Sequence, residues 1–486
     1  MFRKQFIISK KEIRMSDWDM LHAFDYKILL HPEADCCYRN EQDSFYCLIG
    51  NWYSAEQPAY SNKDILSTIV QQHNWEEQLA RIQKLMGIFV FIQITRDNIR
   101  LVQDAAGLQE LFYHSEYQLF GSDLKLLNHF CEGIESKDES VKSFYYSSVF
   151  QKHQLFILHH TNFENYFKLL PNLYLDSKTQ TSIRYFPLDK IKKEEPEEVA
   201  NFATNFLTKI MYAISLRHKL AIPLTAGVDS RVLFLASLNV EAQYFVSQGQ
   251  GVKDNHPDLV ISSRIAKKFN KPFIIQVFEE DKDVRRFQNY WQSVTNPRFN
   301  TLSVRPFEEG FLFINGNVSE IARNFFGDYY NPNGVVLADW QGYKNQSFVI
   351  HHYQEWLKNK KHFDALGYHW ADLFYWEERM GNWAAKGKTE FTAIGHDFIS
   401  PFNSHVLLAR LLSVDRKYRD THFNDLYKLI IRNLAKEHYS KIQHTPFNPS
   451  IKSWCFIIGK RLKIYPLYKQ LRGLWFTFKN RKKLQL

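Results

Sequence analysis

The 486-residue sequence has few cysteines, and their spacing forms neither a metal site nor a disulfide framework. None of the five belongs to a Cys-x-x-Cys pair: they are Cys36, Cys37, Cys47, Cys131 and Cys455. Structural zinc sites and secreted disulfide scaffolds depend on such spacings, so the pattern disfavours both. A reducing, cytoplasmic compartment fits this pattern best.

The sequence also lacks long apolar runs. The charges in its first residues, MFRKQFIISKKEIRM, are not followed by the apolar stretch of a signal peptide. No segment approaches the ~18 apolar residues that a helix needs to span a bilayer. We therefore expect a cytoplasmic protein without a membrane-spanning helix.

Outside its C-terminal end, the chain has little net charge. The formal net charge is +10, from 62 basic and 52 acidic residues. Residues 452–486 contain ten basic and no acidic residues, so the remaining chain is close to neutral. Nucleic-acid binding depends on a basic face, so we do not expect the body of the protein to bind nucleic acid.

Short apolar runs in the N-terminal part predict β-strands. Residues 45–50 and 86–94 form two such runs, and a turn at 96–98 leads into a third strand at 99–102. Between the first two runs, apolar residues at helical spacing predict helix over 63–84. The N-terminal part is therefore expected to be β-rich.

A charged, proline-containing segment at 186–198 is interpreted as a linker between domains. We place one domain at 1–190, a second at 191–450 and a basic aromatic tail at 451–486. Beyond the linker, helices and strands are predicted in alternation: helix 199–213, strand 220–224, helix 231–236, strand 243–247, helix 258–269 and strand 272–278. This alternation predicts a parallel sheet with helices on both faces, followed by a mainly helical region from about residue 348.

The segment between the strand at 220–224 and the next helix is a candidate phosphate site. Gly227 lets the backbone approach a ligand closely, and the loop amides and helix N-terminus attract anions. Ser230 can donate its hydroxyl to a phosphate oxygen. Asp229 suits the site if Mg²⁺ lies between its carboxylate and the phosphate. The alternative is a tight strand-to-helix turn with an Asx cap.

Residues 224–230, Leu-Thr-Ala-Gly-Val-Asp-Ser, resemble the pyrophosphate-binding loop of N-type ATP pyrophosphatases, whose pattern is Ser-Gly-Gly-x-Asp-Ser. Thr225 replaces the Ser and keeps its hydroxyl, and Ala226 replaces the first Gly. The Gly-Lys-Ser ending of a Walker loop is absent. The resemblance implies a doubly wound, adenine-nucleotide α-hydrolase-like domain with added helices. It also implies that the ATP-binding residues include Leu224, Thr225, Gly227, Asp229 and Ser230.

Two later segments resemble asparagine synthetases in the same order. Residues 247–249 and 256–259 are similar to their Val-Gly … Ser-Pro-Asp-Leu stretch, which implies that Gln248 flanks the nucleotide. Residues 313–323 are similar to their Ser-Gly-Glu-Gly-Ser-Asp-Glu segment. That match places Asn315 and Gly316 beside the nucleotide and Glu320 near the metal.

Each of these segments also has a structural interpretation. Asp258 can be a helix cap, and Glu320 with Arg323 can be a surface pair one helical turn apart. The resemblance implies instead that Asp229 and Glu320 together organise Mg²⁺.

A fourth stretch, 377–403, resembles the acceptor region of the same family, and its Arg-x-x-x-Trp version is like divergent members associated with surface-polysaccharide gene sets. Arg379 can hold an acceptor carboxylate through a bidentate fork. It can equally form an ion pair with Glu320 or Asp397. Lys386 and Lys388 are candidates for neutralising the leaving pyrophosphate, or are exposed loop lysines.

The N-terminal region resembles class II glutamine amidotransferase domains through Leu-x-Gly-x-Phe at 85–89, Asp-x-x-Gly at 104–107 and 111–113. This implies an α+β, Ntn-hydrolase-like β-sandwich. Working members use a cysteine with a free α-amino group at the position of Phe2. Glutamine hydrolysis is therefore not expected here, and Asp104 and Gly107 are assigned to turn and packing roles.

The function that the resemblance implies is an ATP-dependent ligase that forms carbon–nitrogen bonds. A carboxylate would be activated as an acyl-adenylate, and ammonia or an amine would then displace AMP. The carboxylate is aspartate or a uronic acid of a polysaccharide precursor, which the sequence does not decide. The alternative is a non-catalytic, nucleotide-binding scaffold that retains the synthetase fold.

The tail at 451–486 interleaves basic and aromatic residues. Such a segment can lie on an anionic membrane surface, which would place the protein at the inner membrane face near lipid-linked substrates. Packing on the synthetase domain and nonspecific polyanion binding are the alternatives.

Overall fold

The structure is a computed structural model that describes residues 1–442 except 117, 132, 250, 303–309, 328–331, 344 and 422, with scattered positions beyond 457. Most of the tail, and the hypothesis that it binds a membrane, lie outside the described residues. Within the described part of the chain, no helix has the length and apolar character needed to cross a membrane.

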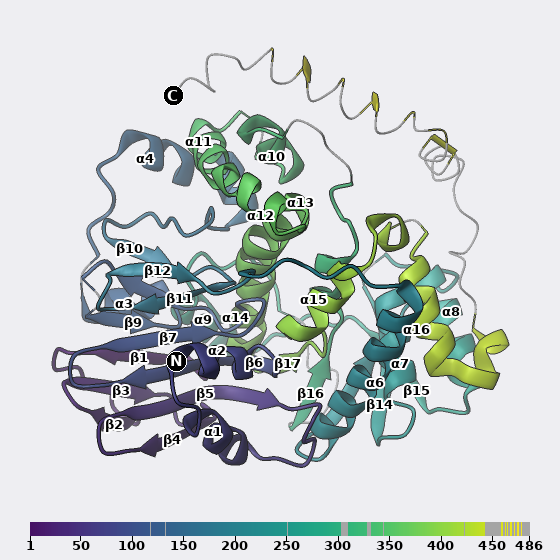
Figure 1. Cartoon of the computed structure of the whole chain (residues 1–486), viewed down its shortest axis with the longest axis horizontal. Coiled ribbons are helices and arrows are strands. Elements are labelled where there is room, and N and C mark those ends of the chain that lie inside the picture. Colours follow the sequence, from purple (N-terminus) through teal and green to yellow (C-terminus); the bar gives the residue numbers. More distant parts are fainter. Residues whose placement is uncertain are drawn as a thin grey trace.

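The N-terminal half contains two antiparallel six-stranded sheets, which lie together at one end of the molecule (Figure 1). The first has the order β10-β8-β9-β1-β3-β2. Its strands are β1 Phe6–Ser9, β2 Asp19–Ala23, β3 Tyr26–Leu30, β8 Phe112–His114, β9 Leu119–Gly121 and β10 Tyr166–Lys168. The second has the order β12-β11-β7-β6-β5-β4. Its strands are β4 Cys36–Asn40, β5 Phe45–Tyr53, β6 Met86–Ile94, β7 Ile99–Gln103, β11 Leu173–Asp176 and β12 Thr181–Arg184.

The three strands expected in this half are confirmed as β5, β6 and β7, with β5 extending to Tyr53. β5 and β6 pair in register from Phe45 with Ile94 to Tyr53 with Met86. Nearly every residue of β6 is buried, because both faces of this sheet are covered. The continuous apolar run in the sequence has this cause.

The helical stretch expected over 63–84 is two helices, α1 Asn62–Val70 and α2 Trp75–Ile82. Ser61 and Asp64 form a capping box at the start of α1. Asn74 caps α2 by accepting the amide of Glu77 at 2.8 Å, which starts a new helix there. The remaining helices of this half are α3 Leu124–Phe130, α4 Glu139–Tyr145 and α5 Ser148–His153.

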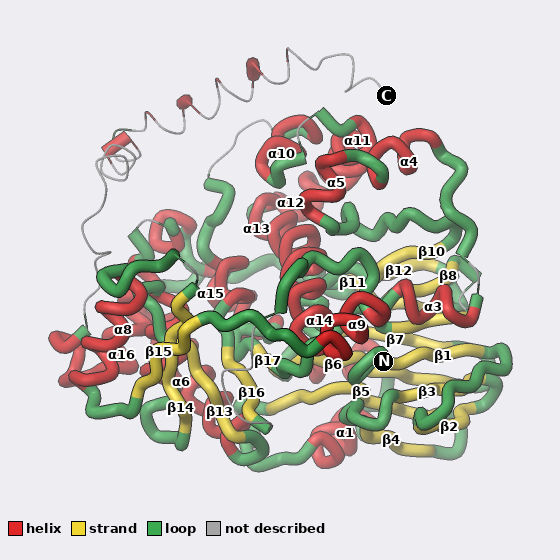
Figure 2. Tube along the Cα trace, turned by 180° about the vertical axis from the view of Figure 1, so that it is seen from behind, coloured by secondary structure: helices red, strands yellow, loops and turns green. Residues whose placement is uncertain are grey.

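A parallel five-stranded sheet forms the centre of the other half, seen from behind at the opposite end to the two antiparallel sheets (Figure 2). Its order is β15-β14-β13-β16-β17. The strands are β13 Lys219–Pro223, β14 Ala242–Gln248, β15 Phe273–Val277, β16 Phe311–Ile314 and β17 Phe398–Ile399. The helices before and between them are α6 Pro196–Ser215, α7 Val228–Ala236, α8 Pro257–Lys268 and α9 Val284–Ser293. The predicted alternation and the mixed α/β class are confirmed.

The chain beyond β16 is mainly helical, as predicted. A short 3₁₀ helix, η1 Asn317–Ala322, follows the strand directly. A π-helical segment, η3 Tyr375–Ala384, joins α13 Trp370–Phe374 to α14 Ala385–Ala393. The other helices are α10 Gly334–Trp340, α11 Ser347–Trp356, η2 Leu357–Asn359, α12 Lys360–Ala365, α15 His405–Ser413, η4 Arg416–Arg419, α16 Asp425–Ala435 and η5 Lys436–Lys441.

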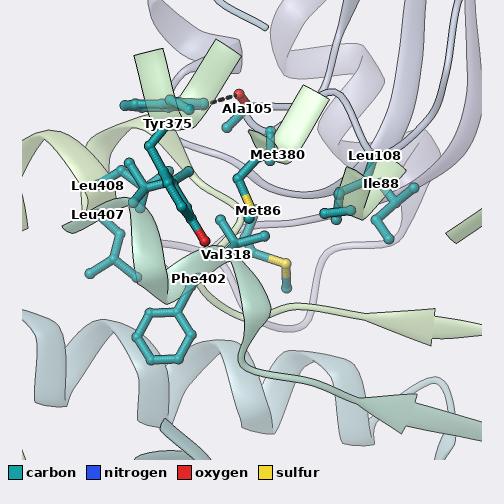
Figure 3. Packing of buried hydrophobic residues seen from close by; sticks show 14 of the residues in the cluster. Met86, Ile88, Ala105, Leu108, Val318, Tyr375, Met380, Phe402, Leu407 and Leu408 are labelled. Atoms are coloured by element: carbon teal, nitrogen blue, oxygen red, sulfur yellow. Dashed lines mark hydrogen bonds between the residues drawn. The ribbon is translucent and has the colours of Figure 1, made fainter. Parts of the chain in front are cut away.

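One hydrophobic core crosses from the antiparallel sheets into the helical region. Figure 3 shows Met86, Ile88 and Leu108 of the N-terminal half beside Met380, Phe402 and Leu407 of the C-terminal half. The indole of Trp376 also donates to the carbonyl of Ala105 at 2.6 Å. The segment 185–195, between β12 and α6, therefore joins two halves that pack as one body.

Candidate phosphate-binding site

The loop at 224–227 lies at the carboxyl end of β13, where the sheet changes direction. β13 is the central strand, with β14 on one side and β16 on the other. The chain moves toward β15 after β13 and returns to the opposite side for β16, which is the topological switch point of such sheets. Ligands bind in the crevice at this position in open α/β folds.

The loop closes on itself through two hydroxyls. Ser230 Oγ accepts the amide of Thr225 at 3.0 Å, and the two hydroxyls lie 2.9 Å apart. Thr225 Oγ1 in turn accepts the amide of Gly227 at 3.1 Å. The tight-turn interpretation therefore describes the loop itself, and the hydroxyls of Thr225 and Ser230 hold its shape.

The N-terminus of α7 remains available above this turn. Its N-cap residue is Gly227, and no side chain caps the helix, so the expected alternative of an Asx cap is wrong. Within the described residues, the amides of Val228 and Ser230 have no hydrogen-bond partner. Unpaired amides at a helix N-terminus favour an anion.

Ala226, the departure from the Gly-Gly pattern, is held from both sides. Its amide donates to Asp258 Oδ1 at 2.8 Å, and its carbonyl accepts Arg231 Nη2 at 2.5 Å. Asp258 is not the cap of α8, because His256 has that role. Arg231 is buried, and within the described chain its Nε and Nη1 have no partner.

Asp229 is bound by two side chains that follow β16. Ser319 Oγ donates to its Oδ1 at 2.7 Å, and Arg323 Nη1 donates to its Oδ2 at 2.6 Å. Burial raises the pKa of Asp229, while the charge of Arg323 opposes that shift. The segments meet because Gly316 has no side chain: a Cβ there would lie 2.8 Å from the Cβ of Asp229.

Glu320 accepts a hydrogen bond from the hydroxyl of Tyr375 in η3. Burial raises the pKa of Glu320, and the negative charge of Asp229 adds to the shift. The surface pair expected between Glu320 and Arg323 does not form, because Arg323 turns to Asp229. Tyr375 was not recognised from the sequence, where nothing distinguishes it from other aromatics.

Arg379 lies in the same π-helical segment, with its guanidinium 4.4 Å from the centre of the Trp383 ring. It lies four residues after Tyr375, the partner of Glu320, in the same segment. Within the described residues it forms no ion pair, and Asp397 is bound instead by Arg3 and Lys4. π-Helical segments often mark functional positions, and a half-buried arginine without a carboxylate partner suits an anionic ligand.

The remaining predicted nucleotide residues have structural contacts. Leu224 is buried, and its amide donates to the carbonyl of Phe245 at 2.8 Å. Gln248 ends β14, and its Nε2 donates to Val252 O at 2.8 Å. The amide of Asn315 donates to Ile399 O at 2.9 Å. All three lie at or just beyond the carboxyl ends of neighbouring parallel strands, the edge at which such sheets bind ligands.

The donor set favours the triphosphate group more than the metal. Free amides, two hydroxyls and nearby guanidiniums suit phosphate oxygens. Both oxygens of Asp229 already accept hydrogen bonds, and Glu320 accepts one from Tyr375. No group of three or more potential metal-ligating side chains occurs within the described residues. The magnesium role of Asp229 and Glu320 stays a prediction that this arrangement does not favour.

The position of the expected lost nucleophile is filled by a hydrophobic side chain. Phe2 is 2% exposed and belongs to the main core. Burial raises the pKa of the Cys37 thiol to about 12, and a hydrogen bond between Cys47 and Cys36, together with burial, raises the pKa of Cys47. A cavity of about 640 Å³ lies beside Arg3 and Lys4, between the antiparallel sheets and β16.

Asp104 has the turn role expected for it, with an added contact that the sequence did not indicate. Its carboxylate accepts the amides of Leu108 at 2.9 Å and Gln109 at 2.8 Å, and Asn403 Nδ2 at 2.7 Å. Gly107 has φ +64°, a conformation that favours glycine. Asn403, which lies in the expected acceptor region, therefore links the C-terminal half to the N-terminal half through this hydrogen bond.

The two expected exposed lysines are neither exposed nor in a loop. Lys386 and Lys388 belong to α14, and Lys386 is 5% exposed. Lys388 Nζ donates to Gln109 Oε1 at 2.7 Å. Lys386 lies among Glu390, Glu110 and Asp123, and burial lowers the pKa of each lysine to about 8. Their described neighbours belong largely to the N-terminal half rather than to the phosphate site.

No family model and no curated protein matches the chain. A solved structure with which it shares a distant likeness is a glutamine phosphoribosylpyrophosphate amidotransferase from B. subtilis, complexed with ADP and GMP. The identity is 12%, the match covers 66% of this chain and 71% of that chain, and the TM-score is 0.24. A TM-score of 0.24 is too low to support a statement about function.

Proposed function

We propose that the chain is an ATP-dependent, AMP-forming amide-bond synthetase of the asparagine-synthetase type. The observation that carries this proposal is the uncapped N-terminus of α7 at the switch point of a parallel sheet, flanked by the hydroxyls of Thr225 and Ser230. This arrangement suits a pyrophosphate group.

In the proposed reaction, an oxygen of the carboxylate substrate attacks the α-phosphorus of ATP, and the bond to pyrophosphate breaks. The α7 amides and Ser230 bind the leaving pyrophosphate, which stabilises its charge. An amine or ammonia then attacks the acyl carbon, AMP leaves, and the amine loses a proton. Arg379 binds an anionic group of the acceptor by its planar fork. Aspartate and a uronic acid remain the two candidate carboxylates.

The N-terminal half is proposed to have a structural role only. Phe2 offers no nucleophile, and burial raises the pKa of the Cys37 thiol. The nitrogen donor is therefore ammonia or an amine-bearing substrate rather than glutamine.

The test is release of pyrophosphate and AMP from ATP by the purified full-length chain, with ammonium and a panel of carboxylates that includes aspartate and uronic acids. Stoichiometric release with one carboxylate is the expected result. ATP binding without pyrophosphate release under any of these conditions would favour the nucleotide-binding scaffold. Absence of ATP binding would remove both functions.

The tail is proposed to contact an anionic membrane surface, on the basis of its ten basic residues and interleaved aromatics. At low salt, the full chain should sediment with anionic vesicles, whereas a chain ending at Ser450 should stay in the supernatant. Equal behaviour of the two would show that the tail has no such role.

A further inference from the structure

The carboxylate of Asp229 is already paired with a positive charge that belongs to the protein. Arg323 Nη1 lies 2.6 Å from Asp229 Oδ2, and Ser319 Oγ occupies the other oxygen at 2.7 Å. Glu320 lies in the same 3₁₀ turn, where its carbonyl accepts the amide of Arg323 at 3.1 Å, while its carboxylate accepts a hydrogen bond from Tyr375. A divalent ion at this position would have to displace the guanidinium.

Besides Asp229, the ring of Tyr427 contacts the guanidinium of Arg323. The guanidinium lies 5.8 Å from the centre of the Tyr427 ring, and the hydroxyl of Tyr427 donates to the carbonyl of Ser319 at 3.0 Å. The Arg323 side chain is 16% exposed. Its Nε is buried and has no hydrogen-bond partner within the described residues. A pre-oriented cation with an unused donor therefore lies beside the N-terminus of α7.

We propose that Arg323, in place of a divalent cation, supplies the positive charge beside Asp229 at the N-terminus of α7, so that pyrophosphate binds there with little dependence on Mg²⁺. This inference rests on the proposed function. Arginine suits the task because its planar fork binds phosphate oxygens and it remains charged at any physiological pH. Arg379, which shares η3 with the Glu320 partner Tyr375, adds a second guanidinium on that side.

The first experiment measures binding of inorganic pyrophosphate to the full-length protein by calorimetry, once with EDTA and once with excess Mg²⁺. The two dissociation constants are expected to agree within about threefold. Binding that disappears in EDTA and returns with Mg²⁺ overturns the inference and leaves the proposed synthetase intact. Absence of binding in both conditions overturns the inference and the proposed pyrophosphate loop together.

The second experiment removes or preserves the guanidinium charge. Arg323→Met should lose about tenfold or more in pyrophosphate affinity in EDTA, whereas Arg323→Lys should keep most of the affinity. Arg432→Met, which removes an exposed cation from α16, is the matched control and should bind as the wild type does. Wild-type affinity of Arg323→Met in EDTA would overturn the inference.

The third experiment uses Mn²⁺ as a paramagnetic probe of the carboxylates. The wild type should bind no Mn²⁺ at this site, whereas Arg323→Met should gain one Mn²⁺ that Asp229→Asn then abolishes. Stoichiometric Mn²⁺ binding by the wild type that depends on Asp229 would overturn the inference. If Arg323→Met does not fold, the wild type and Arg323→Lys still decide it, since neither should bind Mn²⁺.

Discussion

Two aspartates, each placed just beyond a strand, differ in what binds them. Asp104 follows β7, is 1% exposed and accepts several backbone amides as well as the side chain of Asn403. Asp229 follows β13 by a short loop, and its carboxylate is 20% exposed and bound by two side chains. Backbone donors cannot leave without unfolding the turn, whereas side chains can change partners. The first aspartate therefore maintains the structure, and the second can take part in binding.

The same contrast extends to the surroundings of each aspartate. Around Asp104, the amides of Phe89, Leu108 and Gln109 all donate to the carboxylate. Around Asp229, helix amides and guanidinium nitrogens lack partners within the described residues. Polar groups left without partners cost stability, so a fold retains them where a ligand can satisfy them.

The largest expected effect is on stability, at Asp104. The carboxylate of Asp104 accepts hydrogen bonds from several N–H groups. In Asp104→Asn one of its oxygens becomes an NH₂ group, which cannot accept the hydrogen bonds of the N–H groups that face it. We expect the free energy of unfolding to fall by about 3–5 kcal/mol, measured by urea denaturation. Asp97→Asn, in the exposed turn after β6, is the control and should change it by less than about 0.5 kcal/mol. Equal small effects would remove the structural role of Asp104.

The next effect is on the pH dependence of stability, at Glu378. Burial raises the pKa of Glu378 to about 7 from 4.5. Between pH 4.5 and 7, Glu378 is ionised in the unfolded chain but still protonated in the folded protein. The free energy of unfolding therefore falls as pH rises through this range, and the effect of Glu378 is constant above about pH 7. Glu378→Gln should therefore gain on the order of 3 kcal/mol relative to the wild type between pH 4.5 and 7.5.

Glu377→Gln provides the matched control for this difference. Glu377 pairs with Arg184 and accepts the indole N–H of Trp356 at 2.8 Å, so its loss should destabilise the protein at both ends of the pH range. A Glu378→Gln variant whose stability tracks the wild type at every pH would contradict the assignment.

Asp229 should affect catalysis more than stability. Asp229→Asn keeps the shape but releases Arg323 from its charged partner, so pyrophosphate release should fall at least about 100-fold, or about 2.7 kcal/mol in the barrier. Thermal melting checks that the variant is folded. Asp364→Asn, in an exposed pair with Lys360, should turn over as the wild type does. Wild-type turnover by Asp229→Asn, or its unfolding, would show that the two aspartates do not differ as described.

A smaller effect is expected at Gly316, where the segment after β16 meets α7 in the candidate phosphate site. Gly316→Ala places a methyl group 2.8 Å from the Cβ of Asp229, which should push η1 away from α7. We expect a loss of about 1–2 kcal/mol in stability and about tenfold in pyrophosphate release. At Gly249 a Cβ would meet only Val252, at 3.8 Å, so Gly249→Ala is the control. Similar behaviour of the two variants would argue against close packing at Gly316.

The last prediction is that the chain has no glutaminase activity. Glutamine incubated with the purified chain should yield no glutamate above the level with heat-denatured protein, because Phe2 supplies no nucleophile. Ammonium should support the reaction instead. Glutamate production would show that the N-terminal half retains a catalytic group.

Much of the fold follows from local pattern. The runs at 45–50 and 86–94 and the alternation from 199 to 278 predicted their elements, because buried strands and amphipathic helices have distinct periodicities. The break between α1 and α2 was missed, although Asn74 and Glu77 carry a capping signal. Strands as short as β8, β9 and β17 were not expected, since a few residues have no readable period.

The sequence by itself determined the shape of the loop at 224–230, since its residues fold on one another: Thr225 and Ser230 bond across five positions. It could not indicate which partners Asp229 and Asp104 take, because Arg323 is 94 residues from the first and Asn403 is 299 from the second. The sequence also suggested that Lys386 is exposed. In the structure Lys386 is buried in a helix, close to acidic residues that include Glu110 and Asp123 of the N-terminal half. Local hydrogen bonds depend on neighbours in the chain, whereas the pairing of buried charges depends on which segments the packed core brings together.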